Sequence, residues 1–161
     1  MNDYRDQIRD LAFTVSEGMT VYVAIHDRIS KESATFKSFL RNMFGRAVPM
    51  PQLLQDAEGL VPIWNGITEK IASFGSETYS SMDEDERCYF EILNRYAQAV
   101  NETVLALVER QKLLNDDSKS IRNNPLKWSR LKEAERTYKS AIQEYMAIGQ
   151  ELNDASHLVS E

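Results

Sequence analysis

Residues 8–43 read IRDLAFTVSEGMTVYVAIHDRISKESATFKSFLRNM, and this stretch decides the fold class. Eleven positions in it follow one another at steps of three or four residues, with a mean step of 3.5, and nine are apolar or aromatic. Such a repeat is the seam of a helix that supercoils around partner helices. The positions are Ile8, Leu11, Val15, Met19, Tyr22, His26, Ile29, Ser33, Phe36, Leu40 and Met43. One helix over this stretch would be about 54 Å long, roughly three times the usual length.

The same spacing recurs in three later stretches, each of which follows a segment that interrupts the pattern. Gly45, Pro49 and Pro51 end the first helix, because proline cannot continue one. The second seam is Leu53, Ala57, Leu60, Trp64, Ile67, Ile71 and Phe74. The third is Tyr89, Leu93, Tyr96, Val100, Val104, Leu107, Gln111 and Leu114. The fourth is Trp128, Leu131, Tyr138, Ile142, Tyr145, Ile148 or Gly149, Leu152 and Ala155. No stretch has the period of a strand, so the chain is predicted to be all-α.

The segment between the second and third seams leaves two arrangements open. Residues 52–117 could form one long bent helix or two helices that separate near residues 76–83. Ser81 and Glu84 have the spacing of a capping box, which favours a helix start. Gly59 and Pro62 indicate a kink or a late start near residue 62. No strong helix breaker lies near residues 76–83 beyond Gly75, so we expect one bent helix.

The last helix has a clear start. Asn124 can cap it, and Pro125 suits its first position. We therefore expect a single domain over residues 1–161, built as an elongated antiparallel bundle of three long helices with the second one kinked. Four helices are the alternative, and short connections make neighbours in sequence antiparallel.

Few residues offer catalytic or metal chemistry. His26 lies in the first seam, where a buried histidine bonded to a neighbour is expected, and His157 is expected to be solvated. Neither has the Glu-x-x-His partner that a metal site in a helical bundle needs. Cys88 is expected to be a small, half-buried apolar residue. We therefore predict no enzyme activity, no metal and no cofactor.

The uneven distribution of charge along the chain is the feature that points to a function. The chain carries a net charge of −6, which makes a nucleic-acid partner improbable, yet residues 109–140 hold nine basic and five acidic groups. Basic side chains near an anionic lipid surface contribute about 1 kcal/mol each. The candidate membrane-binding residues are Arg110, Lys112, Lys119, Arg122, Lys127 and Arg130. A second basic cluster consists of Arg28, Lys31, Lys37, Arg41 and Arg46. Without a bilayer-spanning stretch or a signal peptide, and with a single cysteine, a cytoplasmic, peripherally membrane-associated protein is expected.

The pattern of the whole chain resembles the C-terminal BAR domain of the sorting nexins. Residues 27–32, followed by Phe36 and Met43, are similar to the first BAR helix, and residues 60–114 are similar to the long second one. Residues 124–135 are similar to the turn into the third helix. The resemblance implies a three-helix antiparallel coiled coil that forms homo- or heterodimers and binds anionic endosomal membranes in protein sorting.

Two functions are therefore expected from the sequence. The first is a BAR-like module that dimerises and associates with membranes in endosomal trafficking. The alternative is a soluble helical adaptor or scaffold whose long faces bind a partner helix. A compact four-helix bundle with a break near residues 76–83 would favour the alternative.

Overall fold

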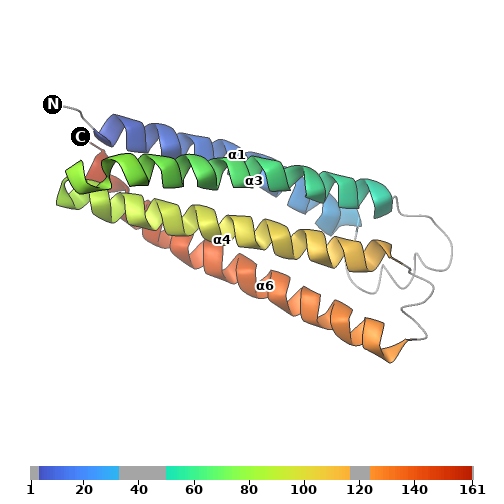
Figure 1. Ribbon diagram of the computed structural model, residues 1–161. Coiled ribbons are helices and arrows are strands. Elements are labelled where there is room, and N and C mark those ends of the chain that lie inside the picture. Colours follow the sequence, from blue (N-terminus) through green and yellow to red (C-terminus); the bar gives the residue numbers. More distant parts are fainter. Residues whose placement is uncertain (1–3, 33–49, 117–123, 161) are drawn as a thin grey trace.

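The computed structural model describes residues 4–32, 50–116 and 124–160, which form four long helices packed together (Figure 1). These are α1 (Tyr4–Glu32), α3 (Met50–Thr78), α4 (Glu84–Asn115) and α6 (Pro125–Asp154). Short 3-10 turns follow two of them, η1 (Tyr79–Ser81) and η2 (Ala155–Val159). Successive helices run in opposite directions, so the two chain ends and the α3–α4 turn lie at the same end of the bundle (Figure 1).

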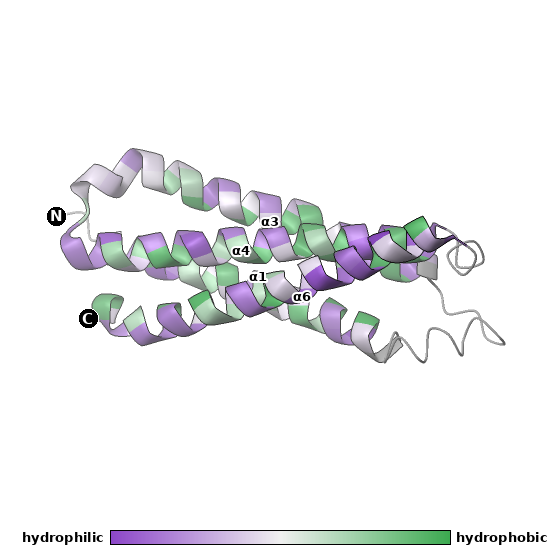
Figure 2. Ribbon diagram, turned by 90° about the horizontal axis from the view of Figure 1, so that it is seen from below, coloured by the Kyte–Doolittle hydropathy of each residue, from purple (hydrophilic) through white to green (hydrophobic). Residues whose placement is uncertain are grey.

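The seams predicted from the sequence form the core. Apolar and polar residues alternate along each helix (Figure 2), and the apolar ones meet at the centre of the bundle. The largest fully buried side chains include Trp64, Tyr22, Ile8, Leu60 and Leu93. The last four positions of the first seam, Ser33, Phe36, Leu40 and Met43, lie outside the described residues. Where the structure describes the seams, the all-α prediction is confirmed.

The single bent helix expected over residues 52–117 is not present. The chain reverses between Thr78 and Glu84, so the bundle contains α3 and α4 in place of one long helix. The late start near residue 62 is also wrong, because α3 is continuous from Met50 and contains Pro62 on its exposed face. Pro51 lies in the first turn of α3, where the missing N–H has no partner to lose.

The reversal has a definite physical origin. Asp83 caps α4: its Oδ1 accepts from the Glu86 N–H at 2.8 Å, and the Asp83 N–H donates to Glu86 Oε2 at 2.8 Å. This capping box lies two residues after the Ser81–Glu84 pair expected from the sequence. Met82, which is 3% exposed, anchors the turn in the core. The lack of a side chain at Gly75 leaves room for the Phe90 ring, because a Cβ there would lie 2.8 Å from Phe90 Cζ.

The start of α6 agrees with the sequence. The Asn124 side chain accepts hydrogen bonds from the N–H groups of Leu126 at 3.0 Å and Lys127 at 3.3 Å, and Pro125 follows the cap. From this start α6 converges on the bundle, so its N-terminal half lies farther from α1 than its C-terminal half (Figure 1). Leu131, together with Leu114 of α4, forms a small separate apolar cluster beneath this end.

The position of the α4 cap is testable by two alanine substitutions. Asp83→Ala should lower the free energy of unfolding by about 1 kcal/mol, since it removes the acceptor for the Glu86 N–H and the ion pair with Arg5. Ser81→Ala should change it by less than about 0.5 kcal/mol. Urea denaturation followed by circular dichroism measures both. A larger loss for Ser81→Ala would place the cap where the sequence first indicated.

Candidate functional site

One of the basic residues proposed for membrane binding points into the protein. The Arg110 side chain is 14% exposed, and its Nε donates to Glu135 Oε2 across the α4–α6 interface. Its Nη1 donates to Gln111 Oε1 at 2.9 Å, and its guanidinium lies 5.9 Å from the centre of the Tyr138 ring. Arg110 therefore holds two helices together and presents little charge to solvent.

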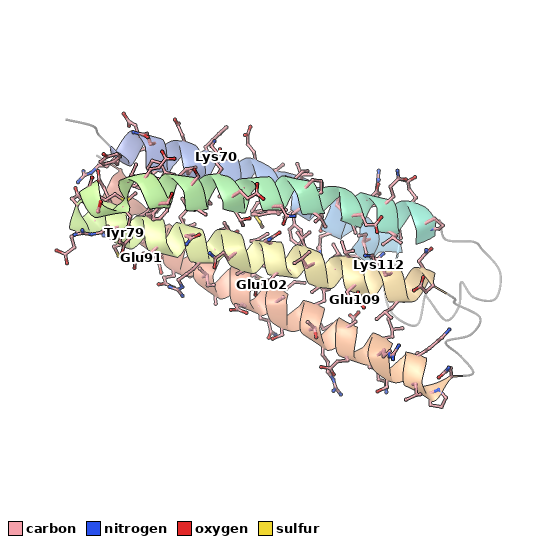
Figure 3. All side chains as sticks on the ribbon, viewed as in Figure 1. Lys70, Tyr79, Glu91, Glu102, Glu109 and Lys112 are labelled. Atoms are coloured by element: carbon pink, nitrogen blue, oxygen red, sulfur yellow. The ribbon has the colours of Figure 1, made fainter. Side chains whose placement is uncertain are left out.

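The other proposed membrane residues separate into two groups. Lys112, Lys127 and Arg130 are exposed at the end of the bundle where α4 finishes and α6 begins (Figure 1). The Nζ of Lys112, which is labelled in Figure 3, lies 3.9 Å from Glu58 Oε1 of α3. Lys119 and Arg122 lie outside the described residues. The structure thus brings three of the six residues to one end of the bundle.

The second basic cluster carries less unpaired positive charge than its sequence indicates, because a carboxylate of α3 pairs with one of its arginines. Arg28 donates to Asp56 Oδ2 at 2.6 Å and joins α1 to α3. Partial burial alone would raise the pKa of Asp56, but the hydrogen bonds from Arg28 and Gln52 and the charge of Arg28 together outweigh it, so the pKa lies below its usual value. Lys37, Arg41 and Arg46 lie outside the described residues, as does the side chain of Lys31.

A polar layer crosses the middle of the bundle and is built from α1 and α6. The Tyr138 hydroxyl lies 3.1 Å from the Tyr22 hydroxyl and 2.5 Å from His26 Nδ1, so it bridges the two α1 side chains. The other ring nitrogen of His26 lies 3.4 Å from Ser30 Oγ. Tyr145 meets the Tyr22 ring edge-on at 5.8 Å. Tyr22 is fully buried and Tyr138 is 5% exposed.

The electrostatics of this layer indicate a structural role. Burial raises the pKa of Tyr138 to about 12 and also raises the pKa of Tyr22, so both hydroxyls stay protonated at neutral pH. Burial lowers the pKa of His26, and the nearby Arg110 charge lowers it further against the opposing effect of Asp27. Neutral hydroxyls and a neutral imidazole can satisfy one another in a core at little cost. The layer therefore aligns α1 with α6, as a neutral hydrogen-bonded group.

A groove runs along the outside of the α4–α6 pair. Two adjoining hollows of about 380 and 400 Å³ share Ala106, Glu133 and Thr137 and so form one continuous surface. Small side chains line its floor: Ala106, Ala134, Thr137, Ser140 and Ala141. Charged side chains line its rim: Glu102, Glu109, Glu133, Glu144, Arg130 and Arg136. Figure 3 shows Glu102 and Glu109 along the edge of α4 that faces α6.

The remaining candidate residues do not form a reactive centre. His157 is exposed, as expected, and its Nδ1 lies 2.9 Å from the Asp154 carbonyl oxygen. Cys88 is exposed, so the expectation that it is half-buried is wrong. Among the described residues, no group of three His, Cys, Asp or Glu side chains could hold a metal ion. None of the helices described here is long and apolar enough to span a bilayer.

Comparison with family models, curated proteins and solved structures finds no match to this chain.

Two features of the site depend on contacts that the sequence does not show. His26 bonds a neighbouring side chain, as its place in the first seam predicts, but its partner Tyr138 lies 112 positions away, and pairing at that separation leaves no local signal. The groove had a weak signal: Ala134 and Ala141 lie seven residues apart at positions that fit the steps of the fourth seam, and Ala106 lies on a face of its helix that the third seam does not use. Nothing in the spacing showed that these two faces lie beside each other.

The lowered pKa of His26 predicts a pH dependence of stability. As the pH falls through about 6.5, the unfolded chain binds a proton at His26 before the folded chain does, so the contribution of neutral His26 is present above that pH and lost below it. We expect the free energy of unfolding to fall between about pH 7.5 and pH 5, measured by urea denaturation.

Two glutamine variants separate this effect from other titrations. His26→Gln keeps a hydrogen-bonding group beside Tyr138 but cannot titrate, so it should flatten the pH dependence. His157→Gln, at an exposed site, should leave the wild-type slope in place. Equal slopes for His26→Gln and the wild type would contradict the prediction.

Proposed function

We propose that this protein is a non-enzymatic interaction module that binds a basic amphipathic helix in the α4–α6 groove. The observation that carries the proposal is the groove itself, in which a floor of small side chains lies between carboxylate rims. The division of residues 50–115 into two helices also favours a compact adaptor over the long rod of a BAR domain.

The floor suits a helix as the occupant. Ala106 of α4 faces Ala134 and Ala141 of α6, and none of the three projects far from the backbone. Small residues let a third helix approach closely and pack into the groove between two others. Leu113 of α4 also lines the groove and offers additional apolar surface. An amphipathic helix would cover this surface with its apolar face.

The charged side chains on the rim of the groove determine which charge the partner helix should carry. Four carboxylates against two guanidinium groups give the groove a net charge of −2. Glu133 and Arg136 lie 3.6 Å apart and offset each other, which leaves Glu102, Glu109 and Glu144 in excess over Arg130. Lysine or arginine residues flanking the apolar face of the partner would complement this rim and speed its association.

The proposal is tested with two synthetic helical peptides of matched length, each with an alanine- and leucine-rich face. One peptide carries flanking lysines and the other carries glutamates. Isothermal titration calorimetry should detect binding of the lysine peptide alone. A protein with Glu102→Lys and Glu109→Lys should bind it at least about tenfold more weakly, equivalent to 1.4 kcal/mol.

A matched charge reversal provides the control. Glu69 and Glu77 are exposed on α3, away from the groove, so Glu69→Lys with Glu77→Lys changes the net charge by the same amount. This variant should bind the lysine peptide like the wild type. No binding by the wild type, or equal weakening by both double variants, would refute groove binding.

Membrane association is a second candidate, and the exposed α6 start favours it. Leu126 is 75% exposed there, and Lys127, Arg130 and Lys132 follow it within six residues. An apolar side chain among basic ones can enter the headgroup region of an anionic leaflet. The endosomal sorting role and the homo- or heterodimer through the long helices, both implied by the BAR resemblance, belong to this candidate.

Vesicle sedimentation tests the second candidate. The wild type should sediment with phosphatidylserine vesicles at low ionic strength and be released as salt is raised. Lys127→Glu with Arg130→Glu should abolish sedimentation, whereas Arg95→Glu, far along α4, should not. Wild-type protein that stays in the supernatant at low salt would exclude membrane association through this end.

A further inference from the structure

The outer face of α1 is unusually poor in charge for a helix at the surface of a bundle. Across residues 11–26, Glu17 is the only charged residue. The core takes only part of this apolar surface, since Phe13 is 65% exposed and Val23 is 43% exposed. A surface helix normally carries charged residues opposite its core face, so this face is built to be covered.

The uncovered residues form a second seam of their own. Arg9, Phe13, Ser16, Thr20, Val23 and Asp27 follow one another at steps of 4, 3, 4, 3 and 4 residues. At 100° per residue they lie about a third of a turn from the core seam. All six are exposed. Where α6 meets α1, Tyr138 contacts the inward-facing Tyr22 and His26, and these six residues stay exposed.

The spacing of these six positions is symmetric about Gly18. Arg9 and Asp27 are equally far from that point, as are Phe13 and Val23, and Ser16 and Thr20. A two-fold axis beside Gly18 would therefore place Arg9 opposite Asp27 of the partner subunit, and Phe13 opposite Val23 of the partner subunit. A parallel arrangement would instead set Arg9 against a second arginine and Asp27 against a second aspartate.

Charge complementarity therefore favours a second copy of the chain, in the antiparallel orientation, as the partner of this seam. We propose that the outer seam of α1 packs antiparallel against the same seam of a second copy and forms a two-fold symmetric dimer. The contact is isologous, so it closes at two subunits. Arg9 is held in place for this contact because its Nε donates to the Val159 carbonyl oxygen at 2.5 Å and its Nη1 to Asp6 at 2.8 Å. Its side chain remains 42% exposed.

Sedimentation equilibrium tests whether the seam forms a dimer. The wild-type chain should show the mass of two subunits. Phe13→Glu should raise the dimer dissociation constant at least about tenfold, and its exposure of 65% makes the change tolerable for folding. Leu105→Glu, at an exposed apolar site on α4, should leave the dimer intact. A monomeric wild type, or a dimer indifferent to Phe13→Glu, would overturn the proposal.

Disulfide trapping tests the orientation, in a Cys88→Ser background so that the introduced thiols act alone. Residues 13 and 23 of one helix are about 15 Å apart, too far for a bond within one chain. The variant with Phe13→Cys and Val23→Cys should therefore form covalent dimers on oxidation, and Phe13→Cys alone should not. Cross-linking by Phe13→Cys alone would indicate a parallel pair and refute the antiparallel register. The outcome is independent of peptide binding in the α4–α6 groove.

Discussion

The reciprocal hydrogen bonds between Asp83 and Glu86 fix the point at which the chain turns back, and the other packing relationships depend on that point. With α3 ending at Thr78 and α4 starting at Glu84, α4 lies between α3 and α6 and buries residues toward both. Fourteen residues of α4 are buried, compared with three of α6. In one continuous helix, the apolar residues that now belong to α3 and α4 would lie end to end along a single axis. The α3–α4 interface would then not exist.

The polar layer specifies how the helices are aligned in a core that is otherwise apolar. Dispersion and burial favour many ways of packing helices side by side, but a shared hydroxyl favours only the ones that bring its partners together. Tyr138 contacts Tyr22 and His26 of α1, while Arg110 and Glu135 join α4 to α6 one turn away. Misaligning α6 by one turn would leave the buried hydroxyls of Tyr22 and Tyr138 without these partners, at a cost of about 1–3 kcal/mol each.

Periodicity predicted the helices and their buried faces well, because each seam is a local property of one segment. Ile8, Leu11 and Val15 are buried as their spacing requires, and Asn124 caps α6. The break near residues 76–83 was harder to predict because Gly75 acts through a contact with Phe90, which lies fifteen residues later. The inward orientation of Arg110 depends on Glu135, which is brought near only by the packing of α6 against α4. Sequence alone therefore assigned Arg110 to the surface with the other basic residues.

The two proposed contact surfaces use different helices, and this has a consequence for how they would work together. The outer seam belongs to α1, whereas the groove lies between α4 and α6 and is lined by neither α1 nor α3. A two-fold dimer through α1 would leave both grooves open, one on each subunit. Two grooves fixed in a symmetric assembly would bind a partner carrying two basic helices more tightly than either groove alone, provided that its linker spans the distance. Weak single contacts along a shallow groove would then be sufficient for a scaffold.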